Sequence, residues 1–229
     1  MSKAPKKNNF FSNLIFNIIL PAVILSRFSS DDSLGPIWAV IIALSLPLLF
    51  GIWELKQSGK VNFFSVLGII SVLLTGGISL LKLDPSYIAV KEAMVPGLIG
   101  VVVFISQFTP YPLVRKLLIN PDILDTEKLA TALAQQNNTT IFDNKVRYAG
   151  FVVASAFFLS SVLNYILAKA IVVSPAGTSA YAEELGRMTW LSYPVIALPT
   201  MVMLFGAIIY TFMQIKKLTQ QPIDDFILS

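Results

Sequence analysis

The segment YIAVKEAMVPGLIGVVVFIS, residues 87–106, decides the fold class of this chain. It is apolar over about the twenty residues that an α-helix needs to cross the hydrocarbon core of a bilayer. It also carries two adjacent charges, Lys91 and Glu92. An ionisable side chain in a membrane costs at least about 2.5 kcal/mol, so it needs a partner, a water-filled cavity or a functional role. The segment therefore predicts a membrane helix with a candidate polar site.

The rest of the chain shares this apolar character. Of its 229 residues, 55% are hydrophobic and 13% are charged, whereas a soluble domain has about 25% charged residues. The apolar residues lie in long blocks, without the alternation that predicts a transmembrane barrel. We expect an all-α fold in which residues 1–229 form a single integral membrane domain. Six transmembrane helices, some kinked by proline, are predicted at about 10–28, 36–54, 63–82, 86–108, 146–172 and 188–214.

The distribution of lysine and arginine predicts the orientation of these helices. One set of segments, formed by the N-terminus, the second and fourth loops and the C-terminus, holds most of the basic residues: Lys3, Lys6, Lys7, Lys56, Lys60, Arg115, Lys116, Lys128, Lys145, Arg147, Lys216 and Lys217. The opposite side holds Arg27, Lys82, Lys169 and Arg187. Because cytoplasmic loops carry an excess of lysine and arginine, both termini are predicted to be cytoplasmic. The positive charge then indicates anionic lipid as a partner, not nucleic acid.

Cysteine and histidine are both absent. The chain therefore has no disulfide, no thiol chemistry and no histidine for a metal site or a proton relay. No nucleophile–base pair is visible either, and a metal site would need oxygen ligands alone. We expect no enzymatic activity, no cofactor and no metal.

The longest hydrophilic stretch, residues 109–145, is predicted to be a cytoplasmic loop. Its prolines 110 and 112 end the fourth helix. A short surface helix is expected to begin at Pro121-Asp122, with Leu129 and Leu133 on one face. This helix lies on the bilayer or over the helix bundle, or alternatively forms a docking site for a partner.

Lys91 and Glu92 have different needs in a membrane. Consecutive residues point about 100° apart around a helix, so the two side chains are not expected to pair with each other. Lys91 lies near the outer end of its helix and can extend its amine towards the interface. Glu92 is shorter, and needs either a cation such as Arg27, Lys82 or Lys169, or a proton.

Two asparagines extend this candidate intramembrane site. Asn17 and Asn164 lie in apolar blocks, and proline four residues after Asn17 and after Glu92 leaves each backbone carbonyl without its helical partner. The four polar residues could line one pocket; alternatively the prolines only shape helix packing. The last two helices weakly repeat the sequence of the first two, with Asn164 at the position equivalent to Asn17, and an internal repeat would favour a transporter.

Further polar residues have simpler interpretations. Ser71, Thr75 and Ser79 recur every four residues and predict a helix-packing stripe. Glu183 and Glu184 are expected to be solvated charges at the interface.

Residues from the third helix onwards resemble a known family. Gly76-Gly77, Lys91, Ser106-Gln107 and Pro112-Leu113 followed by basic residues are similar in type and spacing to the intracellular septation protein A family of bacterial inner-membrane proteins. The resemblance covers roughly residues 70–118 clearly and 145–215 loosely. The tryptophan that the family has on its fifth helix is missing near Gly150, so the chain resembles a divergent member or a sister family.

The resemblance implies a multi-pass protein of the bacterial inner membrane that supports cell-envelope maintenance or division. Its expected partners are the lipid bilayer, other envelope or division proteins of the inner membrane, and a second copy of the chain. The alternative is a small transporter or channel with its polar site at Asn17, Lys91, Glu92 and Asn164.

Overall fold

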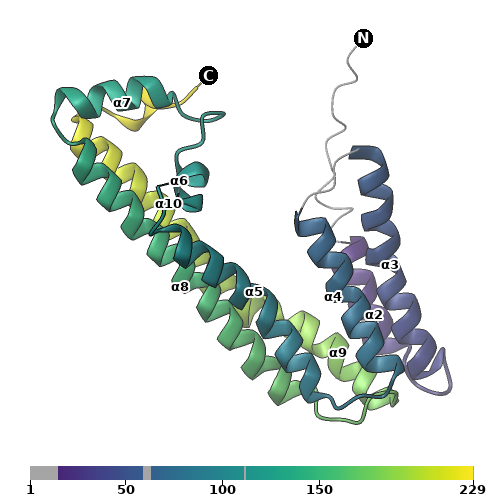
Figure 1. Ribbon diagram of the computed structural model, residues 1–229. Coiled ribbons are helices and arrows are strands. Elements are labelled where there is room, and N and C mark those ends of the chain that lie inside the picture. The colour runs from purple at the N-terminus through teal and green to yellow at the C-terminus, as the bar shows by residue number, and fades with distance from the viewer. Residues whose placement is uncertain (1–14, 59–62, 111, 229) are drawn as a thin grey trace. The chain divides into compact units, whose positions relative to one another are not determined.

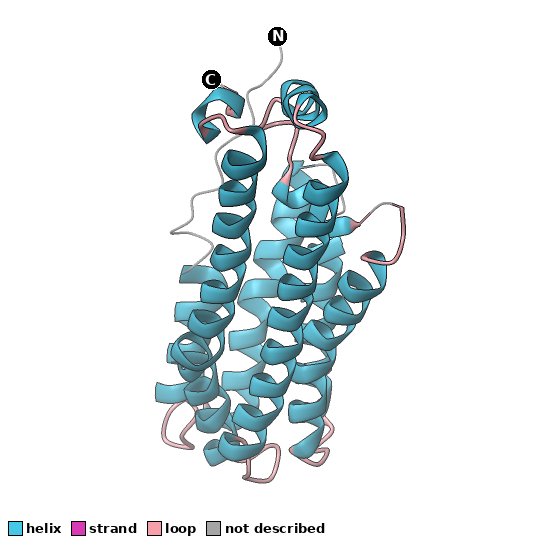
Figure 2. Ribbon diagram, turned by 90° about the vertical axis from the view of Figure 1, so that its left-hand side faces the viewer, coloured by secondary structure: helices cyan, strands magenta, loops and turns pink. Residues whose placement is uncertain are grey.

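The computed structural model describes residues 15–58, 63–110 and 112–228, without the side chains of 17–18, 54–55, 57–58 and 63–69. Regular structure in these residues is helical (Figure 2), and the all-α prediction is confirmed. Extended pairing in the described part is limited to one antiparallel bridge between Leu124 and Ile227. These residues divide into two compact units, which are described separately.

The first unit takes the described residues up to Ala93 together with Leu163–Val195. Its elements are η1 (Ile15–Ile19), α2 (Leu20–Arg27), α3 (Gly35–Ser58), α4 (Phe63–Leu80), the first turns of α5 (Ser86–Ser106), the last turns of α8 (Thr139–Ile171) and α9 (Ser179–Ser192). The second unit takes Met94–Val162 and Ile196 onwards. It holds the remainder of α5 and α8, with α6 (Leu113–Leu118), α7 (Thr126–Gln135), α10 (Leu198–Thr219) and η3 (Ile223–Phe226), and η2 (Tyr193–Ala197) spans the division.

Among the described residues, four helical segments are long and apolar enough to cross a membrane. They are Gly35–Trp53, Ser86–Ser106, Thr139–Ile171 and Ser179–Thr219, with a shorter apolar stretch at Ile70–Leu80. Only 17% to 28% of each apolar window is buried within the protein, so these helices present apolar faces as lipid-exposed helices do. The chain thus has the helices of a membrane protein. The count of six and the cytoplasmic termini stay predictions, and residues 10–14 of the first predicted helix lie outside the described part.

Two π-helical segments precede prolines. η1 contains Asn17 and is followed by Pro21, and η2 contains Val195 and is followed by Pro199. Each proline removes the N–H that would bond the carbonyl four residues earlier. In a π-helix a carbonyl bonds the N–H five residues later, which passes over the proline. Local helix geometry therefore accounts for these two prolines.

The first unit is built on a close approach of α2 and α9. Gly186 of α9 lies against the backbone of α2, where a Cβ at position 186 would be 3.0 Å from the Ala22 oxygen and 3.0 Å from the Ser26 nitrogen. Ala182 precedes Gly186 by four residues, just as Ala22 precedes Ser26. Small residues four apart let two membrane helices meet backbone to backbone.

In the second unit, α7 and the chain's last residues cover the ends of α8 and α10 (Figure 1). The Asp125 side chain caps α7 by accepting a hydrogen bond from the Lys128 N–H at 2.9 Å. The face of α7 that carries Leu129 and Leu133 is buried against α8, α10 and the C-terminal segment. The Asp125 N–H donates to the Phe226 oxygen at 2.8 Å, which fixes that segment beside α7. We call this assembly of α7, η3 and the adjoining helix ends the cap.

Candidate functional site

Lys91 is 6% exposed in the second turn of α5. Its Nζ lies 2.6 Å from the Glu92 Oε1 and donates hydrogen bonds to the Thr75 Oγ1 at 2.7 Å and the Ser71 Oγ at 3.2 Å. The carboxylate and two hydroxyls of α4 therefore satisfy all three ammonium protons. We call Lys91, Glu92, Ser71 and Thr75 the lysine cluster.

The prediction that Lys91 and Glu92 do not pair is wrong. Their Cβ atoms do diverge around the helix, but the long, flexible lysine stem lets its ammonium return to the neighbouring carboxylate. Glu92 therefore has a cation, and that cation is Lys91, not Arg27, Lys82 or Lys169.

The ammonium of Lys91 also points away from the near end of its helix. α4 and α5 are consecutive helices joined by residues 81–85. Thr75 lies five residues before the end of α4, and Ser71 lies one turn further from that end. Because Nζ reaches Ser71, the Lys91 side chain extends along α4 towards the middle of that helix. This is opposite to the outward extension expected of an interfacial lysine.

The hydroxyl stripe of α4 has a polar role beyond packing. Ser71 and Thr75 of this stripe bind Lys91. Its third residue, Ser79, is 3% exposed, and its hydroxyl donates to the backbone carbonyl oxygen of Thr75 at 2.8 Å. The Ser79 Oγ also lies 3.1 Å from the hydroxyl of Tyr181, a fully buried residue of α9. Since the Ser79 proton is directed to Thr75, Tyr181 is the donor of this bond. Polar groups along α4 thus connect Lys91 of α5 with Tyr181 of α9.

The predicted asparagines have different outcomes. The side chain of Asn17 lies outside the described part of the chain. Asn164 is half-buried on α8 and belongs to the same unit as the lysine cluster. Convergence of both residues on Lys91 and Glu92 stays a prediction. Of the two family-like glycines, Gly76 faces Leu44 of α3, whose Cδ1 would be 3.3 Å from a Cβ, and Gly77 faces open space.

Ser106 and Gln107 hold the end of α5 in the second unit. The Ser106 Oγ donates to the Val103 oxygen at 2.7 Å and accepts from the Leu113 N–H at 3.2 Å. The Gln107 Nε2 donates to the same Val103 oxygen at 3.0 Å. Because Leu113 opens α6 directly after Pro112, this motif ties the end of α5 to the start of α6.

Gly150 of α8 makes room for Gln107, a role that no sequence pattern predicts. The Gln107 side chain is fully buried, and a Cβ at position 150 would lie 2.1 Å from its Oε1. Among the described residues this Oε1 has no hydrogen-bond partner. Its position over the Gly150 backbone is one in which a weak Cα–H···O contact forms at helix interfaces. The residues of the family-like motif in this unit therefore act in helix packing.

No family model, no curated protein and no solved structure matches this chain. The resemblance to septation protein A stays a prediction.

Gly150→Ala should destabilise the protein by about 1–3 kcal/mol, the usual effect of overpacking a filled interior. The added methyl group would overlap the amide of Gln107, which has no other room. The measurement is the unfolding midpoint of the purified protein in detergent. A second change, Gln107→Ala, should recover part of the loss because it removes the overlapping atoms.

Gly206→Ala in α10 is the matched control, since a Cβ there meets nothing within 4 Å. An unchanged midpoint for Gly150→Ala would contradict this packing.

The carboxylates near the helix ends bind loop backbone. Glu184 accepts hydrogen bonds from the Val173 and Ser174 N–H groups, each at 2.9 Å, and from the Ser174 hydroxyl at 2.7 Å. The prediction of a merely solvated charge is therefore wrong for Glu184, which fastens the loop between α8 and α9. Asp84 accepts from the Ser86 N–H at 2.8 Å, and hydrogen bonding from Ser86 lowers the pKa of this exposed carboxyl.

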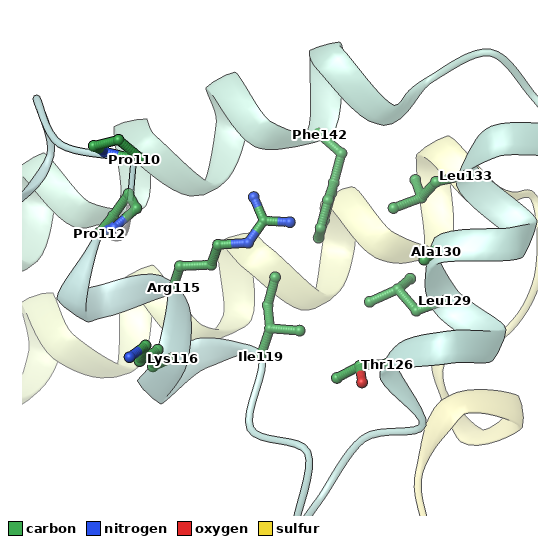
Figure 3. Close-up of a pocket in the computed structure, with 10 residues that line it drawn as sticks. All are labelled: Pro110, Pro112, Arg115, Lys116, Ile119, Thr126, Leu129, Ala130, Leu133 and Phe142. Carbon is green, nitrogen blue, oxygen red and sulfur yellow. The ribbon is translucent and has the colours of Figure 1, made fainter.

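A cavity of about 410 Å³ lies beside α6 and α7 (Figure 3). Its walls are mostly apolar, with Phe142 and Leu133 among them, and Arg115 extends its guanidinium into the space. Arg115 also pairs with Asp143 of α8. Two further cavities, of about 300 and 740 Å³, lie elsewhere, and none of these three is lined by Lys91 or Glu92.

Proposed function

We propose that this chain is a multi-pass protein of the bacterial inner membrane, similar to septation protein A, which supports cell-envelope maintenance or division. In this function it acts as a scaffold that contacts other membrane proteins. The apolar helices Gly35–Trp53, Ser86–Ser106, Thr139–Ile171 and Ser179–Thr219 support its placement in a membrane.

The engagement of Lys91 is the observation that carries this proposal. A transport site presents its charges to a cavity that substrate can enter, whereas a scaffold satisfies them with its own groups. Lys91 is buried and bonded to Glu92, Thr75 and Ser71. Its hydrogen bonds to Thr75 and Ser71 tie α5 to α4, and its ion pair with Glu92 lies within α5.

The cap supports the partner contacts of this proposal. Beside α6 it borders a mostly apolar cavity, whose wall includes Arg115 and Lys116 of α6, and on the predicted topology it faces the cytoplasm. Protein interfaces combine an apolar centre with polar groups at the rim. A cytoplasmic segment with an apolar side chain flanked by acidic residues fits this surface.

A small transporter or channel is the second candidate. It is favoured by Glu92, whose side chain is 26% exposed although its partner Lys91 is 6% exposed. A carboxylate in a membrane helix that remains accessible is a candidate for proton coupling.

The substitution Glu92→Gln separates the two functions. A strain that lacks the gene should show altered cell length or a leaky envelope, and the parent chain should restore it. The scaffold proposal expects Glu92→Gln to restore it equally, because the glutamine oxygen can still accept a bond from Lys91. The transporter proposal expects loss of complementation and loss of proton-coupled uptake in reconstituted vesicles. A gene deletion without any envelope or division defect would contradict the scaffold proposal.

A further inference from the structure

A hollow of about 740 Å³ between α2 and α9 is lined by three charged side chains. Arg27 belongs to the last turn of α2, and Glu183 and Arg187 lie one turn apart on α9. Trp190 and Leu191 add apolar surface to the same hollow. It therefore offers both signs of charge beside an apolar wall.

The two helices that bear these charges are held at a fixed spacing. Gly186, the residue before Arg187, meets the backbone of Ala22 and Ser26 at the close approach described above. Arg27 follows Ser26 directly. The guanidinium groups thus project from the most closely packed helix pair of the unit, which preorganises the hollow for a ligand.

The charges do not neutralise one another. Glu183 and Arg187 have the four-residue spacing at which glutamate and arginine commonly pair on a helix. Within the described residues, however, no ion pair within 4.0 Å involves Glu183, Arg187 or Arg27. All three side chains are exposed. A complementary ligand would carry an anion for the arginines and a cation for the glutamate.

The position of the hollow near the start of α9 fits the depth of lipid head groups. α9 begins at Ser179, so Glu183 and Arg187 are about 6 and 12 Å along it at a rise of 1.5 Å per residue. The apolar segment Ser179–Thr219 has 41 residues, about twice the number needed to cross a bilayer, so its first turns can extend beyond the hydrocarbon. Trp190 is 43% exposed, and tryptophan is enriched at the membrane interface.

We infer that this hollow binds the head group of phosphatidylethanolamine, with the phosphate between Arg27 and Arg187 and the ammonium on Glu183. Guanidinium groups match the geometry of phosphate oxygens. An ammonium group has three N–H donors for a carboxylate. The acyl chains would lie along Trp190 and Leu191. This inference requires the protein to be in a membrane and is independent of the scaffold function.

Lipid retention by the full-length protein tests the inference. The protein is purified in mild detergent, offered phosphatidylethanolamine, phosphatidylcholine and phosphatidylglycerol with identical acyl chains, and analysed by native mass spectrometry. We expect about tenfold tighter retention of phosphatidylethanolamine than of phosphatidylcholine, a difference of about 1.4 kcal/mol. The trimethylated head group of phosphatidylcholine has no N–H to donate to Glu183.

Substitutions in the hollow test which side chains bind the ammonium and which bind the phosphate of the lipid. Glu183→Gln should abolish the preference for phosphatidylethanolamine over phosphatidylcholine, and Arg27→Gln or Arg187→Gln should reduce retention of all three lipids. Asp31→Asn and Lys169→Gln are matched controls in the same unit, outside the hollow, and should behave as the parent. Equal retention of the three lipids by the parent would overturn the inference. So would a preference for phosphatidylglycerol, which would indicate a simple anion site, or unchanged selectivity in Glu183→Gln.

Discussion

Lys91→Met should lower the free energy of unfolding by about 3 kcal/mol, near the lower end of the range for breaking a buried ion pair. The substitution keeps an apolar stem of similar length but leaves the Glu92 carboxylate without its cation in a membrane helix. It also removes the donor that binds Ser71 and Thr75. Glu92→Gln should cost less, because Lys91 keeps both hydroxyl partners and can still donate to the glutamine oxygen.

A double-mutant cycle measures the coupling free energy between Lys91 and Glu92. Lys91→Met combined with Glu92→Gln should be more stable than Lys91→Met alone, because no unpaired carboxylate remains. Denaturant unfolding of the purified protein in mixed micelles gives the free energies. Lys169→Met is the matched control, since Lys169 is exposed in the last turn of α8. If Lys91→Met and Lys169→Met unfold alike, the lysine cluster does not stabilise the protein.

The sequence predicted the helical segments well where length and apolar content decide them. The predicted helix 86–108 is observed as Ser86–Ser106, and 36–54 as Gly35–Ser58. Both segments are long and mostly apolar, and proline within them does not end either helix. Such runs require helical backbone in a bilayer because every N–H and carbonyl must be bonded internally.

The predicted last helix, 188–214, was less accurate. Its segment extends from Ser179 to Thr219 as α9, η2 and α10. The charged residues Glu183, Glu184 and Arg187 lower the hydropathy before residue 188, so hydropathy predicts a loop there. Thr178 nevertheless caps α9, as its hydroxyl accepts from the Tyr181 N–H at 3.2 Å.

The side-chain partners of the candidate site depend on tertiary packing. The spacing of Ser71, Thr75 and Ser79 placed three hydroxyls on one face of α4, but it could not show that this face meets Lys91 and Tyr181. Helix angles alone do not predict the contact of Lys91 with Glu92, because they describe where Cβ points and not where a flexible amine ends. The pairing of Asp125 with Phe226 is likewise non-local, joining residues about a hundred positions apart.

Gly186→Ala should destabilise the protein by about 1–3 kcal/mol through overpacking of α2 against α9. The new methyl group would meet the Ala22 oxygen and the Ser26 nitrogen, each at 3.0 Å. Both are backbone atoms of a helix, so relief requires the two helices to separate along their contact. Thermal unfolding in detergent measures the loss. Gly51→Ala in α3 is the matched control, because its Cβ meets nothing within 4 Å and alanine favours a helix by about 0.5–1 kcal/mol.

The response to a second substitution distinguishes this contact from that of Gly150. Gly150→Ala overlaps the end of the Gln107 side chain, so trimming Gln107 should restore stability. Gly186→Ala meets backbone, so Ser26→Ala, which leaves the backbone nitrogen in place, should restore nothing. Recovery of stability in Gly186→Ala with Ser26→Ala would show that side chains, not backbones, set the spacing of α2 and α9. The hollow that holds Arg27 and Arg187 depends on the same spacing, so Gly186→Ala should also weaken lipid retention, whereas Gly51→Ala should not.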